Sequence, residues 1–321
     1  MKRCSWTGLS LLLFFCMKNA VALPMKGKRV LVTGSTDGIG RHTATRLVEE
    51  GATVLLHGRS MDRLTRTRDE ILKQTNTADA SRIELYCHDL SAISGAKALV
   101  EDILSKTTKL DVLVNNAGVY QPKFVKRPHL IEGKMEELED TFVVNVAAPY
   151  ILFCLLLPLL QAAAGSKILN VSSMSQGGRI EMDNLQFQKE GSYSSHRAYS
   201  ASKLLIAALS HELALKLDPV ADALVMSCDP GTVNTKMLLA GWGYCGIEVG
   251  DADDQFSLIT RPGRNNAHGK YYVYQRESRC TTDVYDHDKR QELWAEMERL
   301  TRVVLPTASE LDVRADLLAI K

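Results

Sequence analysis

The sequence predicts an α/β protein, a doubly wound parallel sheet of about seven strands with helices on both faces. Short runs rich in Val, Ile and Leu recur along the chain, and a stretch with helical spacing follows most of them. Runs with so few polar residues are typical of parallel strands, which are buried on both faces and joined by right-handed helical crossovers. Ligands in such sheets bind beyond the carboxyl ends of the strands, so functional residues are expected there.

The expected elements alternate in order along the chain. Residues 174–196 show no clear period and are predicted to form a loop. Pro149 should kink the fourth helix, because proline lacks the N–H that a helix needs. Strands are predicted at 29–34, 52–58, 82–90, 110–118, 167–173, 223–231 and 270–276. Helices are predicted at 39–50, 60–76, 92–107, 135–161, from 196 onward, and at 286–302.

The size and composition of the chain suit one large domain. Its 321 residues are predicted to form a single domain over 27–303, followed by a tail at 304–321. The 39 basic and 38 acidic residues leave a net charge of +1, which argues against a nucleic-acid partner. The seven cysteines are scattered and include no C-x-x-C pair, so no metal site is expected.

The first 22 residues differ from the rest of the chain. Lys2 and Arg3 precede an apolar run at 9–17, and a small-x-small pattern follows at 20–22, as in a secretory signal peptide. The apolar run is shorter than the ~20 residues of a membrane span. We expect residues 1–22 to be a cleaved leader or, alternatively, an N-terminal anchor that associates the protein with a membrane. The expected location is the secretory pathway, in the lumen or membrane of the endoplasmic reticulum, or the cytoplasm if the leader does not function.

The first strand runs into a glycine-rich turn. Gly34, Gly38 and Gly40 permit a tight turn and a close approach of the backbone to a pyrophosphate, and the following helix offers free N–H groups. A glycine cluster alone is a weak signal, but its place between the first strand and the first helix strengthens it. The predicted nucleotide-binding residues of this turn are Gly34, Ser35, Thr36, Asp37, Gly38, Ile39 and Gly40.

The second strand lacks the acidic residue that would bind the adenosine ribose hydroxyls and favour NAD. His57, Gly58 and Arg59 stand at this strand end instead. The planar donor fork of Arg59 suits a 2′-phosphate, and Arg41 could add charge. We therefore expect NADP(H) to be favoured over NAD(H), with the alternative that both arginines are ordinary surface residues.

The third and fourth strand ends carry further candidates for nucleotide binding. The carboxylate of Asp89, followed by Leu90, could accept a hydrogen bond from an adenine amino group, or it could cap the next helix, as Ser91 could. The N-N-A-G stretch at 115–118 places small residues where backbone can lie against a flat cofactor. A simple strand-end turn is the alternative for this stretch.

The fifth strand ends in Ser172 and Ser173, at the edge of the sheet where a substrate carbonyl could sit. Serines are common in loops, so the pair alone proves little. Asn170 belongs to an N-V-S triplet that matches a glycosylation acceptor, but it lies in a predicted buried strand and is discounted.

The helix after the loop carries Tyr199 and Lys203, which are four residues apart and share one helical face. Tyrosine has a pKa near ~10 and is a poor acid–base group at neutral pH. A nearby ammonium should lower that pKa, and burial should oppose part of the change. The pair is therefore a candidate for general acid–base catalysis, with the polar edge of a packed helix as the alternative.

Together these residues resemble the short-chain dehydrogenase/reductase family, whose domain is a Rossmann fold. The likeness covers roughly residues 27–300, in order, so the set is far more specific than any one motif. The matching motifs are T-G-x-x-x-G-I-G at 33–40, N-N-A-G at 115–118, the serine strand end, Y-x-x-x-K at 199–203 and P-G-T-V-N-T at 230–235.

The resemblance implies a role for each matching residue. Tyr199 would exchange a proton with the substrate oxygen, and Lys203 would lower the pKa of Tyr199 and hold the nicotinamide ribose. Ser173 would steady the substrate oxygen, and Asn145 would hold a water that relays protons. The implied cofactor contacts are Asp89 with adenine, Asn116 with the ribose region and Thr235 with the carboxamide or phosphates, joined by Leu90, Ala117, Gly118, Pro230, Gly231 and Val233.

Two features set this chain apart within the family. Ser173 and Tyr199 are separated by 26 positions, about twice the spacing of many members, and the extra loop resembles the retinol-dehydrogenase-like branch. Members of that branch often act on lipid-like or retinoid carbonyls. Asp229 before Pro230, and the segment 232–265 that forms the substrate lid in the family, depart from the pattern and leave the substrate open.

The predicted activity is NAD(P)-dependent interconversion of an alcohol and a carbonyl, on a small lipid-like or retinoid-like aldehyde or ketone. One alternative is a catalytically silent NADP(H)-binding sensor or scaffold, which the intact Ser–Asn–Tyr–Lys set argues against. Another is a similar enzyme acting on a nucleotide sugar or a carbon–carbon double bond, for which the C-terminal lobe is short. Family members often pair, so the resemblance allows a homodimer.

Overall fold

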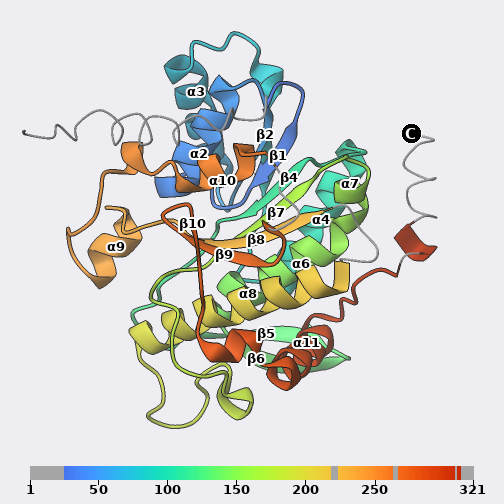
Figure 1. Cartoon of the computed structure of the whole chain (residues 1–321), viewed down its shortest axis with the longest axis vertical. Coiled ribbons are helices and arrows are strands. Elements are labelled where there is room, and N and C mark those ends of the chain that lie inside the picture. Colours follow the sequence, from blue (N-terminus) through green and yellow to red (C-terminus); the bar gives the residue numbers. More distant parts are fainter. Residues whose placement is uncertain (1–24, 218–222, 263–266, 308, 312–321) are drawn as a thin grey trace, which may run out of the picture.

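The computed structural model describes residues 25–217, 223–262, 267–307 and 309–311. At its centre is an eight-stranded sheet with helices on both faces (Figure 1). Every neighbouring pair is parallel except the edge strand β10, which runs antiparallel to β9. The predicted doubly wound α/β class is confirmed. The leader predicted at 1–22, and most of the tail predicted at 304–321, lie outside the described residues.

Most of the strands and helices in the structure lie within the residue ranges predicted for them. Short 3-10 turns occur at Ala80–Arg82, Met182–Asn184, Val249–Asp251 and Thr282–Tyr285. The strands are β1 (Arg29–Val32), β2 (Thr53–Gly58), β3 (Ile83–Cys87), β4 (Val112–Asn115), β7 (Lys167–Val171), β8 (Leu224–Asp229), β9 (Lys270–Val273) and β10 (Arg276–Ser278). The helices include α2 (Gly38–Glu49), α3 (Met61–Gln74), α4 (Ile93–Lys106), α6 (Ala148–Leu155), α8 (Ser195–Leu217), α9 (Lys236–Gly241), α10 (Asp254–Thr260) and α11 (His287–Thr301).

The strand order β10-β9-β8-β7-β4-β1-β2-β3 reverses direction between β1 and β4. From β1 the chain moves outward to β2 and β3, then returns to β4 and continues to β7 and β8 on the other side. Such a reversal opens a crevice at the carboxyl ends of the central strands, where ligands bind in folds of this kind.

Side chains of each central strand alternate between two cores. In β1, Leu31 packs against the layer of α4, α6 and α8, whereas Val30 and Val32 pack against the layer of α2, α3 and α10 (Figure 1). All three side chains are fully buried. Burial of both faces explains why the strands read as nearly unbroken apolar runs.

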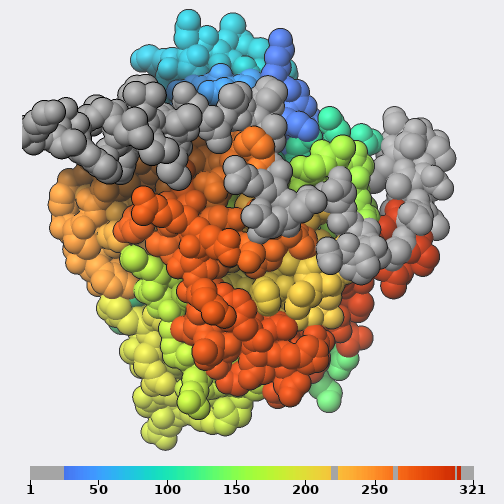
Figure 2. Space-filling model, viewed as in Figure 1, coloured from blue at the N-terminus to red at the C-terminus, as the bar shows by residue number. Residues whose placement is uncertain are grey.

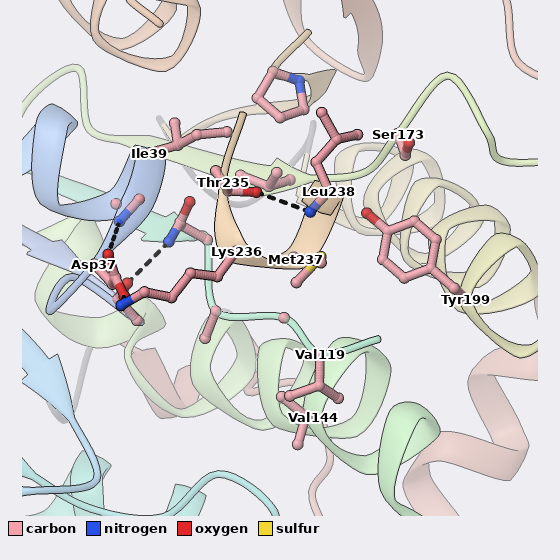
Figure 3. A pocket seen from close by; sticks show the side chains of 18 of the residues that line it. Asp37, Ile39, Val119, Val144, Ser173, Tyr199, Thr235, Lys236, Met237 and Leu238 are labelled. Carbon is pink, nitrogen blue, oxygen red and sulfur yellow. Dashed lines mark hydrogen bonds and ion pairs between the residues drawn. The ribbon is translucent and has the colours of Figure 1, made fainter. Parts of the chain in front are cut away.

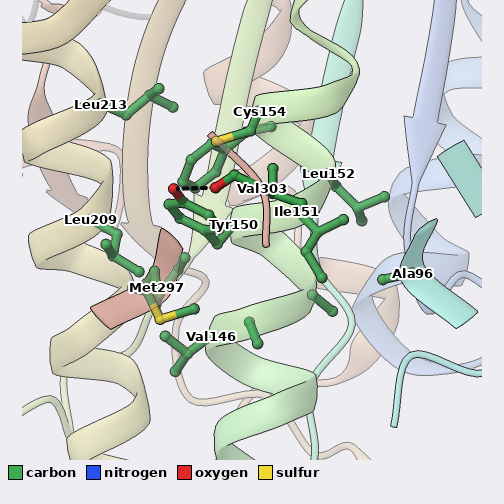
Figure 4. Packing of buried hydrophobic residues seen from close by; sticks show 14 of the residues in the cluster. Ala96, Val146, Tyr150, Ile151, Leu152, Cys154, Leu209, Leu213, Met297 and Val303 are labelled. Carbon is green, nitrogen blue, oxygen red and sulfur yellow. Dashed lines mark hydrogen bonds between the residues drawn. The ribbon is translucent and has the colours of Figure 1, made fainter. Parts of the chain in front are cut away.

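The larger core lies between α6, α8 and α11 (Figure 4). Tyr150 of α6 packs with Leu209 and Leu213 of α8 and with Met297 of α11. Its hydroxyl donates a hydrogen bond to the carbonyl of Val303 at 3.1 Å, so the buried polar atom has a partner. This packing fixes α8, the helix that carries the predicted tyrosine and lysine.

The helix expected over 135–161 is wrong in its first part. Residues Lys126–Ile131 (β5) and Lys134–Glu139 (β6) instead form an antiparallel hairpin. The turn residues Glu132 and Gly133 have φ angles of 51° and 76°, as a two-residue hairpin turn requires. The residues of β6 favour helix by composition, which led to the wrong prediction. The two-residue turn at Glu132 and Gly133 instead pairs this segment with β5 as a strand.

The helical part of this region begins at Asp140–Phe142 (α5). Residues Val143–Ala147 then form a wider π-type turn that ends two residues before Pro149, which has no N–H to donate to the preceding turn. The expected irregularity at Pro149 thus takes the form of this wide turn. The chain breaks again after α6, and Leu157–Gln161 forms the short helix α7.

The strand expected over 270–276 is also wrong as a single element. Tyr274 and Gln275 have φ angles of 48° and 62°, and they turn the chain from β9 back into β10. Figure 2 shows this face, where the orange and red atoms of the C-terminal segment lie across the yellow atoms of α8. Within the described residues, every helix is too short or too polar to cross a bilayer.

Candidate active site

A pocket of about 630 Å³ lies along the carboxyl ends of the central strands, where the sheet topology places a ligand. Of the predicted residues, Ser35, Arg41 and Asn145 are absent from its lining. The predicted residues that line it are Gly34, Thr36, Asp37, Gly38, Ile39, Gly40, Arg59, Asp89, Leu90, Asn116, Ala117, Gly118, Ser173, Tyr199, Lys203, Pro230, Gly231, Val233 and Thr235.

The glycine turn is packed so tightly that side chains are excluded from it. A Cβ on Gly34, whose φ is 64°, would lie 2.9 Å from the Cα of Ala117. A Cβ on Gly40 would lie 2.3 Å from the Nδ2 of Asn116. The turn therefore rests directly on the strand end after β4, and it leaves the N-terminus of α2 open to the pocket.

Two residues predicted to bind the cofactor instead use their side chains to build the turn. Ser35 is fully buried, and its Oγ accepts a hydrogen bond from the backbone N–H of His57 at 3.0 Å. Asn116 donates to the carbonyl of Thr33 at 2.9 Å and accepts from Gln255 at 2.9 Å. The side chain of Ser35 does not reach the pocket, and that of Asn116 is occupied by protein partners.

The positive charge expected at the second strand end comes from Arg59 and from Arg63, four residues later, in α3. Sequence reasoning missed Arg63, which lies in the first turn of α3, just after the strand end that carries Arg59. The expectation that Arg41 adds charge to the site is wrong. Arg41 forms an ion pair with Glu70 at 3.1 Å and does not line the pocket.

Asp89 lies in the turn before α4 and does not cap that helix, whose N-cap is Ala92 without a side-chain hydrogen bond. Its Oδ1 accepts a hydrogen bond from the backbone N–H of Ser91 at 3.0 Å, and the residue also lines the pocket. Arg127 of the β5–β6 hairpin lines the same pocket, held by Asp140 at 2.8 Å. Sequence reasoning predicted no element over 119–134, the stretch that contains β5, and therefore missed Arg127.

The predicted catalytic residues meet at the other end of the pocket. Tyr199 points its hydroxyl toward the interior, on the same side as Ser173 (Figure 3). The Nζ of Lys203 donates to the carbonyl of Val171 at 2.8 Å and lies 5.5 Å from the centre of the Tyr199 ring. Both serines line the pocket, but Ser172 is buried and its hydroxyl donates to the carbonyl of Lys203 at 2.7 Å, whereas Ser173 lies beside the Tyr199 hydroxyl (Figure 3).

Burial is the main cause of the pKa shifts of Tyr199 and Lys203. It raises the pKa of Tyr199 to about 12, against a lowering contribution from the Ser173 hydroxyl. It lowers the pKa of Lys203 to about 8. The expectation that Lys203 brings the pKa of Tyr199 below its usual value is wrong for the protein by itself, because desolvation of the phenolate outweighs the attraction of the ammonium.

Asn145 lies behind the pocket rather than in its lining. Its Oδ1 accepts from the backbone N–H of Val119 at 2.8 Å, and its Nδ2 donates to the carbonyl of Val119 and to the Oγ of Ser202, both at 3.0 Å. A Cβ on Gly118 would lie 3.4 Å from both the Oδ1 of Asn145 and the Nζ of Lys203. Asn145 and Lys203 therefore flank the same glycine.

Asn170, the discounted glycosylation acceptor, is fully buried, as expected. It accepts a hydrogen bond from Asn115 of β4 at 2.8 Å and donates to Ser210 of α8 at 2.9 Å. These bonds connect the two central strands to the helix that carries Tyr199.

The lid predicted at 232–265 contacts the glycine turn. Thr235 caps α9 by accepting from the N–H of Leu238 at 3.2 Å. The next residue, Lys236, donates to the Oδ2 of Asp37 at 2.6 Å, as Figure 3 shows. The lid and the N-terminus of α2 are thus joined by an ion pair across the end of the pocket that lies away from Tyr199.

An aromatic wall of Tyr120, His196 and Trp242 surrounds Tyr199. The ring of Tyr199 is 5.8 Å from that of Tyr120 and 5.7 Å from that of Trp242. The hydroxyl of Tyr120 and the Nδ1 of His196 are 2.9 Å apart. These residues come from three separate segments with no shared motif, so sequence reasoning had no signal for them.

Comparison with known proteins agrees with this arrangement. The family model described as short chain dehydrogenase matches residues 28–240. Human retinol dehydrogenase 14 is 28% identical over 295 residues, which cover 84% of this chain and 85% of that protein. Human retinol dehydrogenase 11 is 34% identical over 221 residues, which cover 68% of this chain and 65% of that protein.

Solved structures share the fold. A protein from Mycobacterium paratuberculosis, described only as uncharacterised, gives a TM-score of 0.70 at 22% identity, over 90% of this chain and 98% of that one. A short chain dehydrogenase from Burkholderia cenocepacia in complex with NADP gives 0.60 at 22% identity, over 78% and 97%. At these identities the likeness shows the fold alone. The family match and the curated relatives go further: the chain belongs to the short chain dehydrogenase family, in its retinol-dehydrogenase-like branch, and is an NAD(P)-dependent oxidoreductase.

Proposed function

We propose that the protein interconverts an alcohol and a carbonyl with NADP(H), and that Tyr199 exchanges the proton. One observation carries the proposal: Ser173, Tyr199 and Lys203 face the same pocket as the glycine turn and the N-terminus of α2. One end of that pocket offers a proton donor and a second hydroxyl, and the other offers backbone N–H groups for phosphate.

The residues present fit a dinucleotide. Gly34, Gly38 and Gly118 line the pocket without side chains, so backbone faces the pocket at these positions. The N-terminus of α2 would hold the pyrophosphate, Asp89 the adenine, and Arg59 with Arg63 a 2′-phosphate. When bound, the nicotinamide supplies the hydride chemistry, and the protein supplies position and charge.

The roles of the chain's own groups follow from their protonation. Tyr199 keeps its proton at neutral pH, because burial raises its pKa to about 12, and it can therefore donate that proton to a carbonyl oxygen. Ser173 would donate a hydrogen bond to the same oxygen. Lys203, buried and bonded to Val171, would present positive charge beside the ring and hold the nicotinamide ribose. Asn145 would orient the water that replenishes the proton.

We further propose a lipid-like substrate, of retinoid or similar character. The catalytic end of the pocket is lined by Met237, Leu238 and Trp242 of the lid, and the aromatic wall continues this apolar surface. Two curated relatives are named for lipid alcohols: human retinol dehydrogenase 14 and mouse polyprenol dehydrogenase, the latter 29% identical over 300 residues. Burying a hydrocarbon chain against such apolar side chains contributes roughly 0.8 kcal/mol of binding free energy per CH₂.

The test of the activity is a panel of aldehydes and ketones of increasing chain length, assayed with NADPH and NADH side by side. We expect turnover, a preference for NADPH, and a KM that falls as the apolar chain lengthens. Trp242→Ala should raise the KM of long substrates more than that of short ones. Tyr244→Ala is the matched control, because Tyr244 lies on the same lid, is largely exposed and does not line the pocket. NADPH binding without turnover of any carbonyl would instead favour a silent sensor.

We also propose that residues 1–22 direct the chain to the secretory pathway, on the charge and apolar pattern of that segment alone. N-terminal sequencing of the protein purified from cells should find a mature end just after Ala22. Retention of Met1 would instead support an uncleaved anchor or a cytoplasmic protein.

A further inference from the structure

Asp229 is a carboxyl group in the pocket that the roles above leave unused. It is the last residue of β8, is 2% exposed and lines the pocket. Its Oδ2 is buried with no hydrogen-bond partner. A buried carboxyl oxygen without a partner is costly, so a protein that keeps one at a pocket wall invites a functional explanation.

The groups around Asp229 connect it to the reacting residues. The backbone N–H groups of Met174, next to Ser173, and of Gly231 face its carboxylate and lower its pKa, against the larger raising effect of burial. Met174 belongs to the serine loop after β7 and Gly231 to the turn after β8, so the carboxylate lies between these two segments of the pocket wall. The other groups that interact with it are Cys228 of β8, Asp254 of α10, Tyr271 of β9, and Tyr199 and Lys203 of α8.

We propose that Asp229 is a positioning residue that holds the Ser173 loop in place and strengthens the binding of protons by Tyr199 and Lys203. The inference rests on the proposed role of Tyr199 in proton exchange. It follows from charge and burial: a carboxylate in a dry pocket destabilises a nearby phenolate and stabilises a nearby ammonium.

The direction of each effect can be stated for both partners. Burial is the main cause that raises the pKa of Tyr199, and the charge of Asp229 raises it further. Burial is the main cause that lowers the pKa of Lys203, and Asp229 opposes that change, as does Cys228. The ring of Tyr120 also lies beside that of Tyr199. Because these groups titrate together, an experiment reads one apparent value for the set.

Asp229→Asn is the decisive substitution. The amide oxygen can still accept from Met174 and Gly231, so the loop stays in place while the charge is removed. In alcohol oxidation, activity rises as Tyr199 loses its proton. In a plot of activity against pH, the rising part of the curve should move to lower pH by about half a unit or more. At a pH on this rising part, the variant should then reach a fraction of its maximal activity about 3-fold higher than the wild type does. Asp229→Ala should also weaken the serine loop and lower kcat.

The matched control is Asp111→Asn. Asp111 is also buried and changes charge by the same amount, but it lies at the opposite end of β4, paired with Lys28 at 2.8 Å. We expect its pH profile to match the wild type. An unshifted curve in Asp229→Asn, or an equal shift in Asp111→Asn, would overturn the proposal. If Asp229→Asn does not fold, Asp229→Ser removes the charge and keeps an acceptor, and the same shift is expected.

A second readout separates this proposal from the proposed activity. The phenolate absorbance of Tyr199, obtained as the difference between the protein and its Tyr199→Phe variant, can be titrated without turnover. Its midpoint should fall when Asp229→Asn is introduced. Loss of all turnover with a falling midpoint would reject the proposed activity alone, and turnover with an unchanged midpoint would reject the role of Asp229.

Discussion

Ionisable side chains are buried at one end of the pocket and exposed to solvent at the other. At the catalytic end, Tyr199 and Lys203 are 9% and 4% exposed, and burial shifts the pKa of each by moving charge out of water. At the glycine-turn end, the side chains of Asp37 and Lys236 are 45% and 83% exposed and pair in solvent. Coulomb interactions are several-fold weaker in water than in a protein interior. A charge at the first end should therefore govern proton transfer, whereas one at the second should make a modest contribution to binding or lid position.

The largest effect expected from this contrast is that of Tyr199→Phe. Removing the hydroxyl takes away the proposed proton donor while the ring still packs against Tyr120 and Trp242. We expect kcat to fall by about 100- to 10,000-fold, with cofactor affinity and melting temperature close to wild type. The measurements are steady-state kinetics, a binding titration with NADPH and thermal unfolding. An active Tyr199→Phe enzyme would remove Tyr199 from the mechanism.

Lys203→Met should separate function from stability at the same end. A pKa lowered from 10.5 to about 8 means that the folded protein binds this proton less tightly than the unfolded chain does. The stabilising effect of a neutral Lys203 is therefore present above pH ~10.4 and is lost as the pH falls through 8. Below that pH the protein must bury a charged ammonium, which destabilises the folded state. Methionine carries no charge, so Lys203→Met removes this destabilisation.

We expect Lys203→Met to lose activity by about 100-fold or more and yet to unfold at higher urea concentration at pH 7, by ~2 kcal/mol in the free energy of unfolding. The gain should shrink between pH 8 and pH 10. Urea unfolding at pH 7 and at pH 10 measures both parts. A variant that is less stable at pH 7 would mean that the bond from Lys203 to Val171 outweighs the cost of burying its charge.

At both ends, short motifs made part of the pocket predictable from the sequence. The catalytic residues and the glycine turn come from short motifs whose spacing sets their geometry, such as four residues on one helical turn. Arg127 and Trp242 reach the pocket from the hairpin and the lid, and Tyr120 packs against Trp242 from a loop, so only tertiary packing brings them together. Glu132 and Gly133 show why the hairpin was missed: a two-residue turn overrides the helical preference of its neighbours.

The roles of Ser35 and Asn116 show a second limit. Both belong to the glycine and N-N-A-G motifs, and the motif alone cannot say which side of the backbone a side chain takes. The structure turns Ser35 inward to His57 and Asn116 toward Thr33. The proton affinity of Tyr199 was likewise beyond the sequence, because it depends on how completely the surrounding segments exclude water.

At the exposed end, the variants Arg59→Ala and Arg63→Ala test whether these arginines select NADPH over NADH. Each guanidinium can donate to a 2′-phosphate, and a charged hydrogen bond contributes about 1.5–3 kcal/mol, or roughly 10- to 100-fold in affinity. We expect each variant to bind NADPH more weakly by up to that factor, with a much smaller change for NADH. Arg41→Ala is the control, because Arg41 pairs with Glu70 outside the pocket. Equal losses for both cofactors would argue against a phosphate role.

The smallest effect should come from Lys236→Ala, which removes the ion pair between the lid and Asp37. Exposed pairs of this kind contribute about 0.2–1 kcal/mol and are weakened by salt. Asp37 still accepts from the N–H of Gly38 at 2.9 Å, so the cap of α2 survives. We expect the free energy of unfolding to fall by less than about 1 kcal/mol, with the difference from wild type vanishing in 0.5–1 M salt, roughly the range in which exposed charges are screened. A loss several times larger, or one that persists in salt, would show that the lid pair is shielded from water and that the two ends of the pocket are less different than their exposure indicates.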